Sequence, residues 1–445
     1  MLIATMVGYT LFYFMRKNFS FAMPGLEQDC GISKDMLGNF LFAGGIVYGL
    51  SKFLNGFVGD RCNSRKMLCL GLLACTLVNV AFGFAPQIAA WFGGGAGGLA
   101  WTFGILLVLN QFFQGTGFPP CARLIAFWVP PNELATKMSV WNTSHSIGGG
   151  LVAKVCGVIM GLGALGAANQ GVGMWRWCFW SMAILGAIGL AGMWLTLPGT
   201  PKEEGLPDLP GTEGVKDESG KVKDVVKGEC GNVEGDSRLS VMRMVFLNPV
   251  IWMLGLCNFA INAARALVAD WGPTLLQEAK SLTSSEAGTV IMLFEFAGIA
   301  GMLFAGWATD RLFGGRAPRL CVFLMALTAG LLAAFWFLPV GGWTKYLAMT
   351  ALCLAGFCLY GPQALTGVTA TNTSTKMFAG TSIGFISLFS YVGVSVSGKV
   401  CGSLAHSSGG WQLPVLAIAG VAAVGCALFV CLWNVRANSY GKAAA

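Results

Sequence analysis

The chain has 445 residues, of which 55% are hydrophobic and 11% are charged, whereas an ordinary soluble domain has roughly 25% charged residues. These charges are too few to cover a globular surface, so the composition excludes a water-soluble fold. The formal net charge of +8 favours an anionic lipid surface, an anionic substrate or both. The 15 cysteines stand singly within apolar runs and lack metal-ligand spacing, so we expect packing residues and no metal or other cofactor.

The apolar stretches predict an all-α membrane protein with twelve transmembrane helices, because about 20 apolar residues cross a bilayer as a helix. The chain begins almost directly in the first stretch, without a charged n-region or a cleavage site. We therefore expect a missing N-terminal extension rather than a signal peptide. The predicted spans are residues 1–26, 38–59, 67–86, 98–128, 138–163, 175–197, 245–271, 287–308, 320–339, 345–370, 378–405 and 411–434.

One long polar segment, residues 198–240, is rich in Gly, Lys, Glu and Asp and is predicted to be a flexible linker. It divides the chain into two six-helix halves, residues 1–197 and 241–437, which are followed by a short tail at 438–445. The loops on the side of the linker and the tail hold 17 Lys and Arg, whereas the opposite side holds 4. Because basic loops face the cytoplasm, we expect the linker and the tail there, and a bacterial cytoplasmic (inner) membrane fits this bias.

An internal repeat relates the two halves. The loop at 56–66 (GFVGDRCNSRK) ends the second span, and the loop at 306–316 (GWATDRLFGGR) ends the eighth. The first and seventh spans also carry trios of equal spacing: Tyr9, Tyr13 and Arg16, and Asn258, Asn262 and Arg265. Each trio lines one face of its helix, so two related halves would present these faces to each other. The GxxxDR loops resemble the signature of the major facilitator superfamily, whose pseudo-symmetric halves surround one central substrate site.

Basic residues outnumber acidic ones inside the predicted spans. A charge in the middle of a bilayer costs on the order of 3 kcal/mol on insertion scales, so an unbalanced positive set indicates a cavity for an anion. The acids at comparable depth are Glu295 and Asp270, the latter at the outer end of its span. The basic residues are Arg16, Lys17, Lys52, Arg123, Lys154, Arg265 and Lys399.

The two repeat-related arginines suit a phosphate, because each guanidinium can donate two parallel hydrogen bonds; a structural ion pair with Glu295 is the alternative. Lys17 points about 100° away from Arg16 on the helix, and it could pair with Asp270 or contact substrate. Lys52 could reach either the cavity or the lipid headgroups. Arg123 and Lys154 are interpreted as snorkelling or inter-helix groups.

The fifth span carries His145 three residues after Asn142, beside a glycine run that lets a ligand or another helix approach closely. A packing or capping role is the alternative to substrate contact for this histidine. On the eleventh span, Tyr391, Ser395 and Lys399 form a stripe at helical spacing, and no acid lies three or four residues from Lys399.

At these residues the chain resembles the organophosphate:phosphate antiporter family of the major facilitator superfamily, which holds the glycerol-3-phosphate and hexose-6-phosphate transporters. The resemblance spans almost the whole chain except the linker. The matching strings are YTLFYFMRKNFSFAMP at 9–24, YGLSKF at 48–53, DRCNSRK at 60–66, QGTGFPPCAR at 114–123, SVWNTSHSIGGG at 139–150, RALVADWGPTLL at 265–276, LFEFAGIAG at 293–301 and LYGPQALTG at 359–367.

The resemblance implies that Arg16 and Arg265 hold the phosphoryl group, that His145 is a third phosphate contact and that Lys52 faces the cavity. It also pairs Lys17 with Asp270 and Arg16 with Glu295. Further residues that it places at or near the site are Tyr13, Tyr48, Trp141, Asn142, Tyr360 and Tyr391.

The chain departs from the family pattern at three positions. Phe118 stands where the family often has Trp, and Asn262 replaces a Tyr that glycerol-phosphate carriers have. Lys399 is similar to a basic residue of hexose-phosphate carriers, but it lacks the usual nearby Asp. An unpaired ammonium there could favour a substrate with an extra carboxylate, such as a phosphoglycerate.

The function expected from the resemblance is exchange of an organic phosphate ester for inorganic phosphate by alternating access, with a hexose-6-phosphate such as glucose-6-phosphate as substrate. Glycerol-3-phosphate, a phosphoglycerate, or a receptor role without transport are the alternatives. The sequence disfavours an ATP-driven pump, because it has no GxxxxGK[ST] string, and it disfavours a membrane enzyme or a channel. We expect a monomer in the lipid bilayer that binds no nucleic acid.

Overall fold

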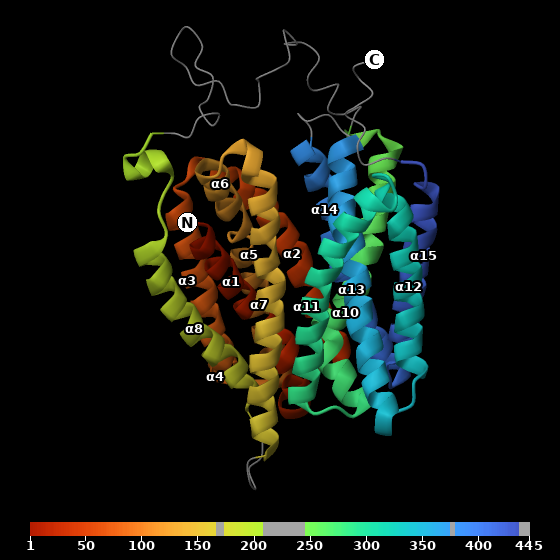
Figure 1. The fold of residues 1–445 in the computed structure, drawn as a ribbon. Coiled ribbons are helices and arrows are strands. Elements are labelled where there is room, and N and C mark those ends of the chain that lie inside the picture. The colour runs from red at the N-terminus through yellow and green to blue at the C-terminus, as the bar shows by residue number, and fades with distance from the viewer. Residues whose placement is uncertain (166–172, 208–244, 374–378, 436–445) are drawn as a thin grey trace, which may run out of the picture.

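The computed structural model describes residues 1–165, 173–207, 245–373 and 379–435. In these residues the chain is a bundle of long helices arranged as two sets that lie side by side (Figure 1). We call α1–α8 the N-terminal set and α10–α15 the C-terminal set. Of the predicted linker, residues 208–240 lie outside the described residues, and so does the predicted tail at 438–445.

Helix bounds in the N-terminal set follow the predicted spans with two differences. The helices are α1 (Leu2–Cys30), α2 (Lys34–Arg61), α3 (Ser64–Gly83), α4 (Ala85–Trp91), α5 (Gly95–Gln114), α6 (Phe118–Trp128), α7 (Pro131–Leu165) and α8 (Trp175–Thr196), followed by the short 3-10 helix η1 (Pro201–Glu204). The short helix α4 lies beyond the predicted third span. The predicted single span at 98–128 is divided into α5 and α6, because Gly117 caps α6 and prolines without an N–H donor occupy its first turn.

The C-terminal set has one helix for each predicted span. The helices are α10 (Pro249–Lys280), α11 (Ser284–Arg311), α12 (Ala317–Phe337), α13 (Gly342–Thr373), α14 (Ala379–Ser408) and α15 (Gln412–Cys431). Ten of the described helices in the chain are long and apolar enough to cross a membrane. The predicted spans outside these ten correspond to α1, which carries two adjacent cations at its middle, and to the divided pair α5 and α6.

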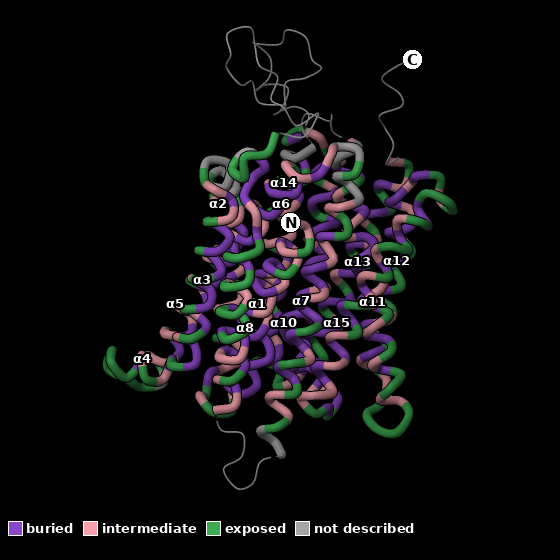
Figure 2. Tube along the Cα trace, turned by 60° about the vertical axis from the view of Figure 1, so that its left-hand side comes forward, coloured by how far each residue is buried: buried purple, intermediate pink, exposed green. Residues whose placement is uncertain are grey.

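Many exposed positions of these helices carry large apolar side chains, which suit a lipid environment. Figure 2 shows exposed and buried stretches alternating along each tube. Large apolar side chains that are exposed on different helices include Leu70, Leu77, Ile188, Leu303 and Phe323.

The internal repeat extends to the ends of the helices. Gly31 and Ser281, 250 residues apart, both adopt a left-handed conformation that ends α1 and α10. Ser33 and Thr283, also 250 residues apart, cap α2 and α11 by accepting a backbone hydrogen bond through their side chains. Each of α1 and α10 also contains an internal proline eight residues after its arginine. The repeat therefore specifies the same local geometry in both sets.

The two sets meet through α1 and α10, α2 and α14, and α7 and α11. At the end of the bundle where α1 and α10 end, which we call the far end, glycines allow backbones to touch. A Cβ atom added at Gly288 would lie 2.4 Å from the Ala153 carbonyl oxygen, and one at Gly38 would lie 3.1 Å from the Gly398 carbonyl oxygen. Lys34 also bridges Glu27 and Glu278 across the sets, at 2.7 and 3.0 Å. The far end is thus closed by backbone contact and by ion pairs.

Substitution of Gly288 by Ala should weaken this closure, because the new methyl group would overlap a carbonyl oxygen of α7. Overpacking of this kind costs about 1–3 kcal/mol, so the melting temperature of the purified protein should fall by several degrees. Gly306→Ala on the same helix is the control, since a Cβ there meets nothing within 4 Å. Equal melting temperatures for the two variants would contradict tight packing at the far end.

Candidate functional site

Arg16 lies at the middle of α1, where it faces aromatic rings rather than an acid. Its guanidinium carbon is 3.9 Å from the centre of the Tyr48 ring and 5.5 Å from that of Tyr13. Among the side chains that the structure describes, no carboxylate forms an ion pair with Arg16. Cation–π contact compensates such a charge only in part, so this guanidinium remains available to an anion.

Arg265, the repeat-related arginine on α10, is instead paired. Its Nη2 atom lies 3.2 and 3.3 Å from the two carboxylate oxygens of Glu295, and its Nε atom donates to the Tyr360 hydroxyl at 2.7 Å. Tyr360 in turn donates a hydrogen bond to Glu295. The resemblance paired Glu295 with Arg16; the structure corrects this, because Glu295 and Arg265 lie on neighbouring helices of the same set. The alternative of a structural ion pair thus applies to Arg265.

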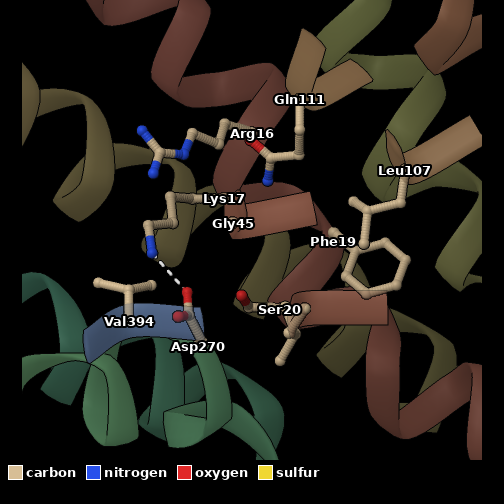
Figure 3. Close-up of a pocket in the computed structure, with 10 residues that line it drawn as sticks. Arg16, Lys17, Phe19, Ser20, Gly45, Leu107, Gln111, Asp270 and Val394 are labelled. Atoms are coloured by element: carbon tan, nitrogen blue, oxygen red, sulfur yellow. Dashed lines mark hydrogen bonds and ion pairs between the residues drawn. The ribbon is translucent and has the colours of Figure 1, made fainter. Parts of the chain in front are cut away.

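Lys17 joins the two sets at the centre of the bundle. Its ammonium lies 2.5 Å from a carboxylate oxygen of Asp270 on α10, and both side chains are largely buried. Figure 3 shows this contact, with the Arg16 side chain directed away from it. The ion pair is a direct link between α1 and α10, and separation of the two sets at this point would break it.

Lys52 on α2 is a second cation that contacts the opposite set. Its ammonium donates to the Tyr391 hydroxyl at 2.7 Å and lies 4.1 Å from the centre of the Phe118 ring. The Tyr48 and Tyr391 rings also meet, with centroids 5.2 Å apart. These contacts place Lys52 between the sets rather than at the lipid headgroups. It too forms no ion pair within the described residues.

His145 lies between rings from both sets. Its ring centroid is 5.8 Å from that of Tyr13 and 6.2 Å from that of Tyr360, with which it is nearly parallel. Nδ1 contacts the Asn142 carbonyl oxygen, and Nε2 lies 3.2 Å from the Ser146 hydroxyl. Arg265 contacts Tyr360, and His145 stacks on the Tyr360 ring, so His145 lies close to Arg265.

Trp141 packs against the rings of Tyr9 and Phe118. Its side chain is fully buried, with its ring centroid 4.7 Å from that of Tyr9 and 5.6 Å from that of Phe118. Phe118 therefore supports both Trp141 and the Lys52 ammonium.

Two further candidates lie away from this cluster. Asn262 is buried and donates to the carbonyl and side-chain oxygens of Asn258, which itself binds Ser390 and so fastens α10 to α14. Lys399 is exposed, with its ammonium 5.9 Å from the centre of the Phe42 ring.

Lys154 donates to Thr289 at 2.8 Å across the sets, as an inter-helix group would.

A small cavity lies beside Arg16, between the two sets (Figure 3). Its volume is about 30 Å³, which is enough for one or two water-sized groups but too small for a phosphate ester. A substrate of that size therefore requires the sets to move apart. The residues that line the cavity are Arg16, Lys17, Phe19, Ser20, Leu41, Gly45, Leu107, Gln111, Asp270 and Val394.

Comparison with known proteins identifies the family. Residues 5–398 match the family model described as Major Facilitator Superfamily. The chain is 34% identical over 402 residues to the membrane sensor protein UhpC of Salmonella typhimurium, with 89% of this chain and 83% of the relative covered. It is 33% identical to the probable hexose phosphate transport protein of Chlamydia pneumoniae, with 98% and 91% covered. It is also 34% identical to the glycerol-3-phosphate transporter of Bacillus subtilis, with 88% and 82% covered.

The chain belongs to the major facilitator superfamily, in its organophosphate:phosphate antiporter family. It is a multi-pass integral membrane protein of a transporter family and not an enzyme. The fold agrees with solved transporters of the superfamily. The inward-facing, occupied structure of a bacterial homologue of the human lysosomal transporter Spinster matches with a TM-score of 0.71 at 14% identity, covering 98% of this chain and 96% of that one. The predicted all-α fold and family are thereby confirmed.

Two residues of the central region were not among the predicted site residues. Tyr9 packs against both Tyr13 and Trp141, and the repeat trio already contained it. Gln111 lines the cavity beside Arg16. The signal that could have found it is the run Asn110–Gln111 and Gln114 at the end of an otherwise apolar span, because amides inside a membrane need partners.

The Lys17–Asp270 pair should behave as a coupled unit in this transporter. Asp270→Asn or Lys17→Met alone leaves one buried charge without its partner, at a cost of about 3 kcal/mol, and should lower the melting temperature by several degrees. Lys17→Met combined with Asp270→Leu removes both charges and should lower it less than either single change. Thermal unfolding of the purified proteins checks this, and an additive loss in the double variant would contradict coupling.

Proposed function

We propose that this protein is a secondary transporter that exchanges an organic phosphate ester for inorganic phosphate by alternating access. The single observation that supports this most is the pair of cations without carboxylate partners among the described residues, Arg16 and Lys52, which lie between the two sets. A dianionic phosphoryl group supplies the missing negative charge, and guanidinium and ammonium groups donate the hydrogen bonds that its oxygens accept.

The proposed movement is rocking of the two sets, residues 1–197 and 241–437, about this centre. Repulsion between like charges is strong in a low-dielectric region, so the unpaired cations Arg16 and Lys52 oppose closure of the sets when no anion is bound. A phosphoryl group neutralises Arg16 and Lys52 and so favours closure around it. The empty carrier then reorients poorly, which makes exchange of one phosphate species for another obligatory.

Arg265 enters this mechanism through its bond to Glu295. A phosphoryl group between the sets would compete with Glu295 for the Arg265 guanidinium, whose Nε atom also donates to the Tyr360 hydroxyl. His145 stacks on Tyr360, so this exchange of partners would be transmitted to α7. Tyr13, Tyr48, Tyr391 and Asn142 complete the proposed site.

A hexose-6-phosphate such as glucose-6-phosphate is the proposed ester, supported by the relative named a probable hexose phosphate transport protein. Glycerol-3-phosphate is the alternative ester, since the named glycerol-3-phosphate transporter is equally similar. A phosphoglycerate is a third, for which a relative named phosphoglycerate transporter protein at 28% identity gives support. The exposed Lys399 would contact a substrate carboxylate only if the sets open around it.

A sensor of external sugar phosphate is the second candidate function, because the membrane sensor protein is among the relatives of similar identity. Such a protein would bind the ester without net flux. For either function we propose a monomer in a bacterial cytoplasmic membrane, with the linker and the C-terminus in the cytoplasm, as the excess of basic residues on that side indicates.

Counterflow in proteoliposomes tests the proposal. Vesicles loaded with inorganic phosphate should take up radiolabelled glucose-6-phosphate, and Arg16→Lys should reduce this uptake at least tenfold, because an ammonium cannot replace the planar fork of the guanidinium. Arg319→Lys is the matched control: Arg319 contacts the Trp433 carbonyl oxygen, remote from the centre, and should retain near wild-type uptake. Parallel vesicles with glycerol-3-phosphate and 3-phosphoglycerate rank the esters.

Two outcomes would contradict the exchange mechanism. Rapid uptake into vesicles that contain no phosphate would mean that the empty carrier reorients freely. Saturable ester binding by the purified protein, together with no flux in any vesicle, would instead support the sensor.

A further inference from the structure

Gln111, which lines the cavity beside Arg16, carries a hydrogen-bond acceptor that no described residue satisfies. Gln111 on α5 is only 9% exposed, and its side-chain oxygen has no hydrogen-bond partner within the described part of the chain. Buried side-chain oxygens in folded proteins nearly always have a partner. An unsatisfied acceptor at the wall of a cavity therefore points to a ligand donor.

Gln111 packs closely against α2, beside the cavity. Gly44 on α2 has no side chain, and a Cβ atom there would lie 3.1 Å from Cγ of Gln111. Figure 3 shows the amide end of Gln111 turned toward Arg16 and Lys17. Neither cation satisfies the amide oxygen, because Lys17 is bound to Asp270 and Arg16 lies against the Tyr48 ring.

The Gln111 oxygen can bind a hydroxyl group of a ligand but not its phosphoryl group. The phosphoryl oxygens of a phosphate-ester dianion only accept hydrogen bonds, so they cannot satisfy the Gln111 oxygen, which also only accepts. A hydroxyl group can donate to it. The cavity volume of about 30 Å³ admits a group of that size but not a phosphoryl group.

We propose that the Gln111 side-chain oxygen accepts a hydrogen bond from a hydroxyl on the organic part of the phosphate ester, while the cations hold its phosphoryl group. Gln111 is then a specificity-determining residue for hydroxylated phosphate esters. This inference rests on the proposed phosphate-ester site, but it holds equally for a transporter and for a sensor.

Equilibrium binding to the purified full-length protein tests this assignment. The probes are glucose-6-phosphate and glycerol-3-phosphate, which carry hydroxyls, together with ethyl phosphate and inorganic phosphate, which lack an alcohol hydroxyl. Gln111→Met keeps the length of the side chain and removes the acceptor. The hydroxylated ester that the wild type binds more tightly should lose about tenfold in affinity, the scale of one neutral hydrogen bond, whereas ethyl phosphate and inorganic phosphate should change less than twofold.

Inorganic phosphate binding reports that the variant is folded, and Gln111→Ala replaces Gln111→Met if the latter binds none. Equal losses for all four probes, or unchanged affinity for both hydroxylated esters, would overturn the assignment. Loss of all phosphate binding in both variants would overturn it as well, because Gln111 would then support the site as a whole. If Gln111→Met selectively weakens binding of the hydroxylated ester but the wild type shows no transport in vesicles, only the exchange function is contradicted.

Discussion

Positive charge at the centre of an apolar bundle is the constraint on which the rest of this structure depends. Arg16 and Lys52 lie against aromatic rings, and neither has a carboxylate partner within the described residues. Aromatic faces stabilise cations less than an ion pair does in a low-dielectric region. Lys17 and Arg265, by contrast, have acidic partners. The centre thus combines paired charges, which hold the structure together, with unpaired charges, which an anion can satisfy.

The helices around this centre explain how an anion could control movement. At the far end, glycines of α2, α7, α11 and α14 bring backbones into contact, and Lys34 bridges the sets. Toward the centre, cross-set contacts become polar and breakable, as in Lys17 with Asp270 and Lys52 with Tyr391. An anion that rearranges these polar contacts therefore acts on the same surface that the glycines close. Binding and closure share one interface.

Much of the architecture could be predicted from the sequence, because the length of an apolar run and the spacing of a repeat are local properties. The helices followed from them, apart from α4 and the division of the span at 98–128 into α5 and α6. The partner of Glu295 did not, since spacing along one helix does not say which neighbouring helix lies within reach. The break at Gly117 depended on two prolines inside an otherwise apolar run. Gln111 was not predicted, because its place among the amides Asn110 and Gln114 does not show which of them lacks a partner in the fold.

The measurement that tests the central claim most directly is equilibrium binding of radiolabelled inorganic phosphate to the purified protein and to its Arg16→Gln variant. The account predicts saturable binding to the wild type and at least a tenfold loss of affinity in the variant, because the variant removes a central guanidinium that has no acidic partner in the structure. Phosphate affinity that is unchanged by Arg16→Gln, in a variant whose melting temperature equals that of the wild type, would contradict it.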